Sequence, residues 1–170
     1  MTHRILNIAD VVVRSGEPDR MPRGETAERY DLRSGEIASR LGARQLGYHL
    51  TVVAPGKRNC PFHSHRAEEE MFFILAGEGE VRIGNGGFPI REGDIIACPT
   101  DGPETAHQIM NTGTLEMRYL AVSTQAPIEV CDYPDSGKFG VYADPESDGR
   151  APRLRYLGRH EEAHDYWEGE

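Results

Sequence analysis

The chain has 170 residues, enough for one compact domain that buries its own core. Its formal net charge of −9 argues against nonspecific binding to nucleic acid or to an anionic membrane surface, and the longest apolar run, residues 71–76, is far shorter than a membrane span. Three cysteines without CxxC spacing (Cys60, Cys98 and Cys131) argue against a disulfide framework or a zinc knuckle, and predict a reducing, cytoplasmic compartment.

Nineteen glycines and eleven prolines predict a chain that reverses direction often, which is typical of proteins built from many short strands. Residues 1–43 are predicted as an N-terminal arm, because glycines and prolines follow its one short apolar stretch. From residue 44 onward apolar side chains alternate with small or polar ones, the period of a β-strand, at Leu46, Tyr48, Leu50 and Val52.

Further apolar stretches, separated by turns that contain Gly or Pro, continue to residue 122, at 70–75, 80–83, 95–98, 105–110 and 115–122. Strands this short at nearly regular spacing indicate an all-β sandwich or barrel, which we assign to residues 44–122. Residues 123–170 lose this periodicity and are predicted as an extended C-terminal arm. Because sheets with open edges commonly pair, we expect a homodimer in which the N-terminal strand adds to the neighbour's sheet.

Three histidines and a glutamate in the predicted barrel form a candidate metal site. His63 and His65 are one residue apart, which places both imidazoles on the same face of a strand. Glu70 begins the next strand, so a turn between the two strands would bring it back beside them, and a later stretch supplies His107. Such a set suits one divalent ion of Mn, Fe, Co, Ni, Cu or Zn, and leaves two positions of an octahedral ion open for a chelating substrate.

The two stretches that carry these residues resemble the paired motifs of the cupin superfamily. His63, His65, Glu70 and Gly77 fit the first motif, and Gly93, Pro99, His107 and Asn111 fit the second. The resemblance implies a small single-domain bacterial cupin with a jelly-roll barrel, in which His63, His65, Glu70 and His107 bind the metal. It also implies turns at Gly77, Gly93 and Pro99 and a structural role for Asn111.

The residues favour an enzyme that acts on a small oxygen-rich molecule. A redox-inert ion would support isomerisation or epimerisation, and a redox-active ion would support an oxygenase or decarboxylase. Candidates for a general acid or base are Glu104, Tyr48, Lys138 and His49. Residues 59–122, which carry the two candidate metal-binding stretches, hold only four basic residues, Arg66, Arg82, Arg91 and Arg118, and this argues against a phosphorylated sugar. The alternative is a non-catalytic module that binds a sugar or another effector.

Some features have two interpretations. Residues 132–140, with Tyr133 and Lys138, are either an ordered loop or a strap that places one of these side chains near the substrate. Residues 160–164 match the HExxH pattern of zinc proteases, but their charged flanks favour a solvated turn. Cys60 and Cys98 are expected to pack as small buried side chains, and Glu68 and Glu69 to lie in solvent.

Overall fold

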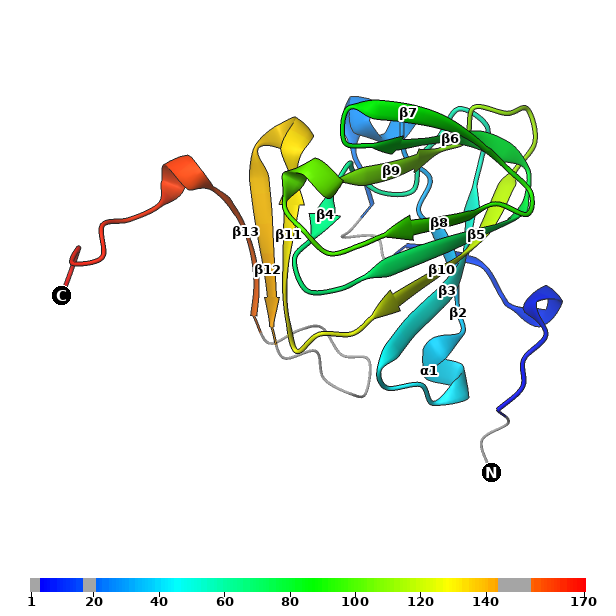
Figure 1. The fold of residues 1–170 in the computed structure, drawn as a ribbon, viewed down its shortest axis with the longest axis horizontal. Helices are drawn as coiled ribbons and strands as arrows, with labels where there is room; N and C mark the ends of the chain where they lie inside the picture. The colour runs from blue at the N-terminus through cyan, green and yellow to red at the C-terminus, as the bar shows by residue number, and fades with distance from the viewer. Residues whose placement is uncertain (1–3, 17–20, 144–153) are drawn as a thin grey trace.

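The computed structural model describes residues 4–16, 21–143 and 154–170 and shows an almost entirely β protein (Figure 1). Its one α-helix in these residues, α1 (Ala38–Leu41), is a single turn. Short 3-10 turns occur at η1 (Ile8–Asp10), η2 (Gly24–Glu28), η3 (Pro103–Thr105), η4 (Pro134–Ser136) and η5 (His160–Glu162). No helix of the described residues has the length and apolar character needed to cross a membrane.

One wall of the barrel is a six-stranded antiparallel sheet. Its strands, in spatial order, are β1 (Arg14–Ser15), β2 (Arg33–Glu36), β3 (Leu46–Val53), β10 (Met117–Thr124), β5 (Glu70–Ala76) and β8 (Ile95–Cys98). The central pair, β3 and β10, runs in register over eight residues, from Met117 opposite Val53 to Thr124 opposite Leu46. This long pair forms the rigid base from which the other strands extend.

Two smaller sheets complete the barrel. One has the order β7 (Gly86–Arg91), β6 (Glu78–Ile83) and β9 (His107–Met110), and the other has the order β13 (Leu154–Arg159), β12 (Lys138–Ala143), β11 (Ile128–Tyr133) and β4 (Ser64–His65). An isolated bridge between His63 and His107 joins the two sheets. The prediction of an all-β jelly-roll barrel is therefore confirmed.

The core of the barrel consists of side chains that alternate along these strands and meet between the sheets. Ile74 and Met117 are completely buried there, and Val81 and Ile109 reach them from the smaller sheet. Shortening such a side chain, for example Ile74→Ala, costs about 2–5 kcal/mol of unfolding free energy.

Tight turns connect the strands where glycine is required. Gly77 and Gly93 have φ values of +87° and +92°, a conformation that favours glycine. The two turns lie side by side, because the Glu92 N–H donates to the Gly77 carbonyl and the Gly93 N–H donates to the Ile74 carbonyl. Their expected role as turn residues is confirmed. Asn111 is also structural: its buried amide donates to the carbonyls of Val53 and Leu115.

Residues 1–43, expected as an arm, cover the outer face of the large sheet in the part that the structure describes. β1 and β2 extend this sheet beyond β3. Val11 and Ile37 are buried against Leu50 and Val52 on the side of β3 that faces away from the barrel interior. The two faces of β3 therefore serve two different apolar clusters, which explains why Leu50 to Val53 are all buried.

Residues 123–170, expected as an arm without periodicity, contain strands β11, β12 and β13. β11 pairs with β4, with Cys131 opposite His65 and Asp132 opposite Ser64. Apolar periodicity is absent from β11 because two of its buried side chains, Glu129 and Asp132, are charged and are paired with the loop after β4. The strand is held by polar contacts, which a hydrophobic pattern does not reveal.

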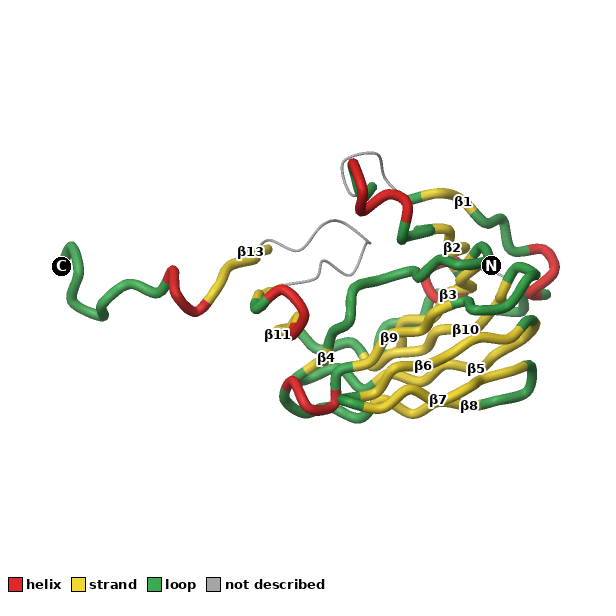
Figure 2. Tube along the Cα trace, turned by 90° about the horizontal axis from the view of Figure 1, so that it is seen from above, coloured by secondary structure: helices red, strands yellow, loops and turns green. Residues whose placement is uncertain are grey.

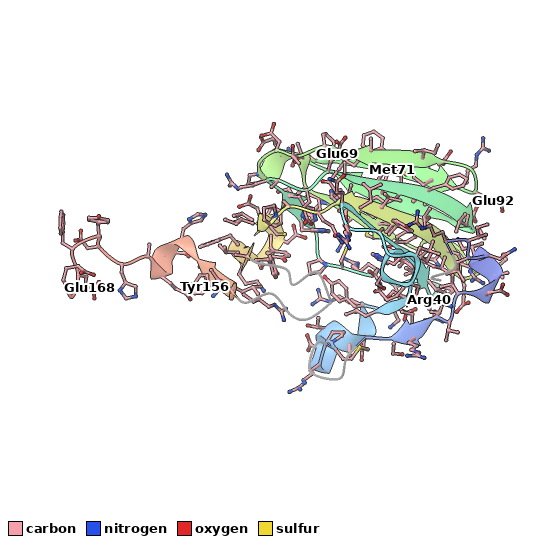
Figure 3. All side chains as sticks on the ribbon, turned by 90° about the horizontal axis from the view of Figure 1, so that it is seen from below. Arg40, Glu69, Met71, Glu92, Tyr156 and Glu168 are labelled. Carbon is pink, nitrogen blue, oxygen red and sulfur yellow. The ribbon has the colours of Figure 1, made fainter. Side chains whose placement is uncertain are left out.

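The segment after β13 projects away from the barrel (Figures 1 and 2). Figure 3 shows Glu168 on this projecting part, apart from the side chains of the barrel. The histidines of the HExxH pattern lie in it and are exposed, and His164 Nδ1 is 2.9 Å from Glu168 Oε2. The expected solvated turn is confirmed.

Candidate metal centre

Backbone pairing between distant segments brings the first histidine to the third. The His107 N–H donates to the His63 carbonyl at 2.8 Å, and the His63 N–H donates back to the His107 carbonyl at 3.2 Å. This pair of bonds fixes the loop before β4 against the first residue of β9. His65 follows two residues later on β4, so its imidazole lies on the same side as that of His63.

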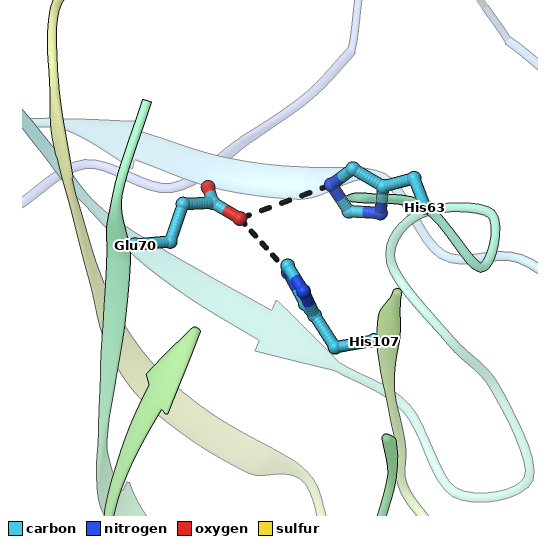
Figure 4. A group of neighbouring side chains, drawn as sticks. All are labelled: His63, Glu70 and His107. Atoms are coloured by element: carbon cyan, nitrogen blue, oxygen red, sulfur yellow. Dashed lines mark hydrogen bonds and ion pairs between the residues drawn. The ribbon is translucent and has the colours of Figure 1, made fainter. Parts of the chain in front are cut away.

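The three predicted histidine ligands converge on one carboxylate oxygen of the fourth predicted ligand, Glu70. Oε2 of Glu70, the first residue of β5, is 2.9 Å from His107 Nε2, 3.3 Å from His65 Nε2 and 3.8 Å from His63 Nε2. Figure 4 shows the Glu70 carboxylate pointing toward His63 and His107, with one oxygen joined to both by dashed lines. Ligand atoms of His63, Glu70 and His107 all lie within 4.8 Å of one another.

The arrangement fits a divalent cation. The Nδ1–H of His63 donates to the Pro61 carbonyl at 2.9 Å, because a carbonyl can only accept, so Nε2 presents a lone pair to Glu70. A lone pair that faces a carboxylate oxygen is repelled, and a cation between them replaces this repulsion with attraction. Nε2 of His65 is buried without a hydrogen-bond partner, as is expected of an atom that binds an ion.

The charges of the group depend on one another. Burial would raise the pKa of Glu70, yet contacts with His107 and His65 hold it well below its usual range. Burial, together with the nearby charges of His107 and His65, lowers the pKa of His63 to about 4. Burial also opposes protonation of His65, but its contacts with Cys131 and Glu70 outweigh burial and raise its pKa to about 11. Without a metal, a proton on His65 balances Glu70.

The loop between His65 and Glu70 is held by a carboxylate that the sequence pattern did not single out. Glu129 of β11 accepts backbone N–H bonds from Arg66 at 3.0 Å, from Ala67 at 3.2 Å and from Glu68 at 2.6 Å. These bonds fix the path of the chain between two predicted ligands. Outer groups of this kind orient metal ligands and influence metal affinity.

Arg66 strengthens the same connection. Its Nε donates to Asp132 Oδ2 at 2.8 Å and its Nη2 donates to Oδ1 at 3.2 Å, so the guanidinium binds the carboxylate through two nitrogens. In the sequence, the only sign of this contact is the pair of acidic residues in β11. Acidic residues in a strand are usually solvated, so the sequence did not predict that these two are buried.

A cavity of about 310 Å³ lies beside the imidazoles of His63 and His65, between β4 and the β11–β12 hairpin. Glu68, Glu129, Tyr133 and Tyr142 contribute to its walls. The expectation that Glu68 is solvated was wrong: it is half-buried in this wall, and its Oε1 accepts the Ala126 N–H at 2.9 Å. Glu69 is exposed as expected.

The candidates for a general acid or base lie in different places. Tyr48 packs in the outer cluster with Leu50 and Val52, and therefore faces away from the barrel interior. Lys138 and Glu104 are exposed, on β12 and η3 respectively, and neither lines the cavity. His49 is on the inner face of β3, and burial lowers its pKa. Of the two residues weighed for a strap, Tyr133 faces the cavity and Lys138 does not.

Two of the three cysteines lie beside the histidines. Cys98 and Cys131 are buried and Cys60 is partly buried, and all three are free thiols. Sγ of Cys131 is 3.4 Å from His65 Nδ1, and Sγ of Cys60 is 3.9 Å from His63 Nδ1. The expected burial of Cys98 is confirmed, and Cys60 is less buried than expected.

Comparisons with known proteins place the barrel in context. Residues 49–123 match the family model "Cupin domain". An oxalate-binding protein from Thermotoga maritima is 42% identical over 70 residues, which cover 41% of this chain and 54% of that protein. The chain spans about half the length of the curated relatives it matches first.

Two solved structures extend the similarity. A candidate sugar phosphate isomerase from Acidithiobacillus ferrooxidans has a TM-score of 0.66 and 26% identity, over 79% of this chain and 81% of that one. A sugar phosphate isomerase from Silicibacter pomeroyi has a TM-score of 0.76 and 21% identity, over 94% of both chains. The second similarity concerns the fold, and it includes segments on both sides of the family match.

Proposed function

We propose that the chain is a cupin, as the match of residues 49–123 to the cupin domain model supports, and that it binds one divalent transition-metal ion through His63, His65, Glu70 and His107 to act on a small oxygen-rich molecule. The observation that carries the proposal is the convergence of three Nε2 atoms on one Glu70 oxygen, within 2.9 to 3.8 Å. Three imidazoles and a carboxylate are donors that suit Mn, Fe, Co, Ni, Cu and Zn.

The bound ion would supply a Lewis acid that holds substrate oxygens and stabilises negative charge on them. The chain itself contributes position and proton transfer. Glu129 holds the loop between His65 and Glu70, so the ligands are preorganised. Glu68 presents a carboxylate at the cavity wall, where burial raises its pKa above the usual value, and we propose it as the group that transfers a proton.

Proton transfer beside a Lewis acid supports isomerisation or epimerisation of a substrate with neighbouring oxygens. If the ion is redox-active, an oxygenase or decarboxylase reaction is the corresponding proposal. Relatives and neighbours named for oxalate or for sugar phosphates support an oxygen-rich small substrate, since both kinds of molecule offer oxygens to a metal.

The second candidate function is a binding module without turnover. It is favoured by the positions of Tyr48, Lys138 and Glu104, none of which lines the cavity. The two functions differ in whether the protein moves substrate protons. We also keep the proposals of a cytoplasmic location, from the three free thiols, and of a homodimer.

The exchange of substrate hydrogens with solvent deuterium tests whether the protein is an enzyme. The metal-loaded protein is incubated in D₂O with panels of sugars, sugar acids and dicarboxylates, and NMR follows deuterium at carbon. We expect exchange on one of these compounds, lost in His107→Ala. Binding without exchange or other conversion of any compound supports the binding module, and neither binding nor conversion contradicts both functions.

A further inference from the structure

The cavity beside the imidazoles is lined by acceptors and hydroxyl groups. We propose that the part of the substrate lying in this cavity carries hydroxyl or ammonium groups and no phosphate. The inference rests on the proposed function, because the cavity adjoins two of the proposed ligands, His63 and His65. It specifies the substrate class that the fold and the ligand set leave open.

Glu68 provides the acceptor for such a group. Its Oε1 accepts the Ala126 N–H at 2.9 Å, and Oε2 has no hydrogen-bond partner among the described residues. The side chain is half-buried, so a donor on the ligand would replace water at this oxygen. A hydroxyl group or an ammonium group supplies that donor, whereas a phosphate dianion does not.

Glu129 adds a second carboxylate to the same wall. Its two oxygens are occupied by the N–H groups of Arg66, Ala67 and Glu68, so it is not available to hydrogen-bond a ligand. Its charge remains, however, and it is buried close to the cavity. A phosphate placed here would face two carboxylates in surroundings that screen charge poorly.

Two tyrosines supply the complementary donor. The hydroxyl groups of Tyr133 and Tyr142 are 3.0 Å apart, so one donates to the other and the remaining O–H hydrogen is free for a ligand oxygen. The Tyr133 ring is stacked on the His63 imidazole with a centroid distance of 6.2 Å, which fixes this hydroxyl relative to the metal site. The lining thus offers a ligand hydroxyl group both an acceptor, on Glu68, and a donor, on one of the tyrosines.

Basic side chains near the cavity are already paired. Arg66 binds Asp132 through two nitrogens. Arg82 donates to Asp135 at 2.8 Å, and its guanidinium lies 3.6 Å from the centre of the Phe62 ring. Among the described residues, no lysine or arginine lines the cavity. A phosphate group in this part of the cavity would therefore find no lysine or arginine to bind it.

The test compares three probes on the metal-loaded protein: D-ribose, D-glucosamine and D-ribose 5-phosphate. Their dissociation constants are measured by NMR titration for the wild type and for Glu68→Gln, with Glu69→Gln as the exposed control. The ratio between variant and wild type cancels any direct contact of the phosphate with the metal.

We expect Glu68→Gln to weaken the binding of glucosamine by about tenfold and that of ribose by less. The same substitution should strengthen the binding of ribose 5-phosphate. Glu69→Gln should change none of the three. The inference is overturned if Glu68→Gln weakens ribose 5-phosphate or leaves glucosamine unchanged, or if none of the probes binds the wild type.

Titration of the metal-free protein separates this inference from the proposed function. Apart from His63 and His65, the cavity lining comes from β11, β12 and the loops that precede β5 and β11, none of which supplies a proposed ligand to this lining. Glu68→Gln should therefore weaken glucosamine binding in the metal-free protein as well, and this is the sign of the effect that the test examines. A protein that takes up no metal but shows this sign contradicts the metal proposal alone. A protein that takes up metal but lacks this sign contradicts the cavity inference alone.

Discussion

The carboxylate of Glu129 accepts a 2.6 Å hydrogen bond from the backbone N–H of Glu68. A strand far along the chain thus fixes the loop that separates two proposed metal ligands, His65 and Glu70. The contact connects the C-terminal strands to the candidate metal centre, and it has consequences for stability and for metal binding.

Replacing Glu129 by alanine should leave the backbone N–H groups of Ala67 and Glu68 without their acceptor, whereas the Arg66 N–H keeps the Val130 carbonyl. Hydrogen bonds to a charged group contribute about 1.5–3 kcal/mol, so we expect the unfolding free energy to fall by about 2–3 kcal/mol in chemical denaturation. Metal affinity should fall by about 10- to 100-fold, as is usual when the outer partners of a metal site are lost. Glu69→Ala, at an exposed neighbouring position, is the control. Unchanged metal affinity in Glu129→Ala would show that the loop does not position the ligands.

Substitutions of His107 and of His164 should differ in their effect on metal uptake. His107→Ala removes a buried imidazole 2.9 Å from Glu70 and should abolish binding of a stoichiometric ion. His164→Ala removes an exposed imidazole of the HExxH pattern and should have no effect. Metal content after dialysis measures both. Equal loss in the two variants would assign the ion to the C-terminal segment.

Metal binding should release a proton at neutral pH. The pKa of His65 is raised from 6.5 to about 11, so the metal-free protein holds a proton there that an ion must displace. Apparent metal affinity should therefore rise with pH between 7 and 9. Calorimetry in two buffers of different ionisation enthalpy measures the released proton. Uptake without proton release would mean that His65 is not a ligand.

The same shifts predict the stability of the metal-free protein. A raised pKa contributes stability that is complete below 6.5 and is lost as the pH rises toward 11. The lowered pKa of Glu70 contributes stability above 4.5 that is lost as the pH falls through its folded value. The lowered pKa of His63 acts in the opposite sense to that of His65 and reduces stability as the pH falls below 6.5. Denaturation midpoints should therefore be highest near the unfolded histidine pKa of about 6.5, and His65→Gln should flatten the alkaline side.

The predicted homodimer has a defined edge on which to form. β1 is the last strand of the six-stranded sheet, with β2 as its partner among the described residues. The Gly16 N–H donates to the Leu32 carbonyl, toward β2. Because successive N–H groups of a strand point to opposite sides, the Ser15 N–H points away from β2, toward the open edge of the sheet. Sedimentation of the wild type should give about twice the chain mass of 19.0 kDa, and Ser15→Pro should give the single chain mass. A wild type that sediments as a single chain would contradict the dimer.

The sequence was informative where one physical rule decided the outcome. HxH spacing places His63 and His65 on one strand face, and the structure brings both to Glu70. The alternation in β3 predicted a strand, but it did not predict which face lies inside, because both faces are apolar. The positions of Tyr48 outside the barrel and His49 inside it therefore came only from the structure. β11 could not be recognised, since its buried Glu129 and Asp132 are satisfied by partners more than sixty residues earlier in the chain.

Elemental analysis of the full chain, purified without a chelating column, tests the central claim most directly. We predict about one divalent transition-metal ion per chain, and its near absence from His107→Ala prepared in the same way. A wild type that contains no such metal, and that gains no thermal stability when Mn, Fe, Ni or Zn is added, would contradict the account.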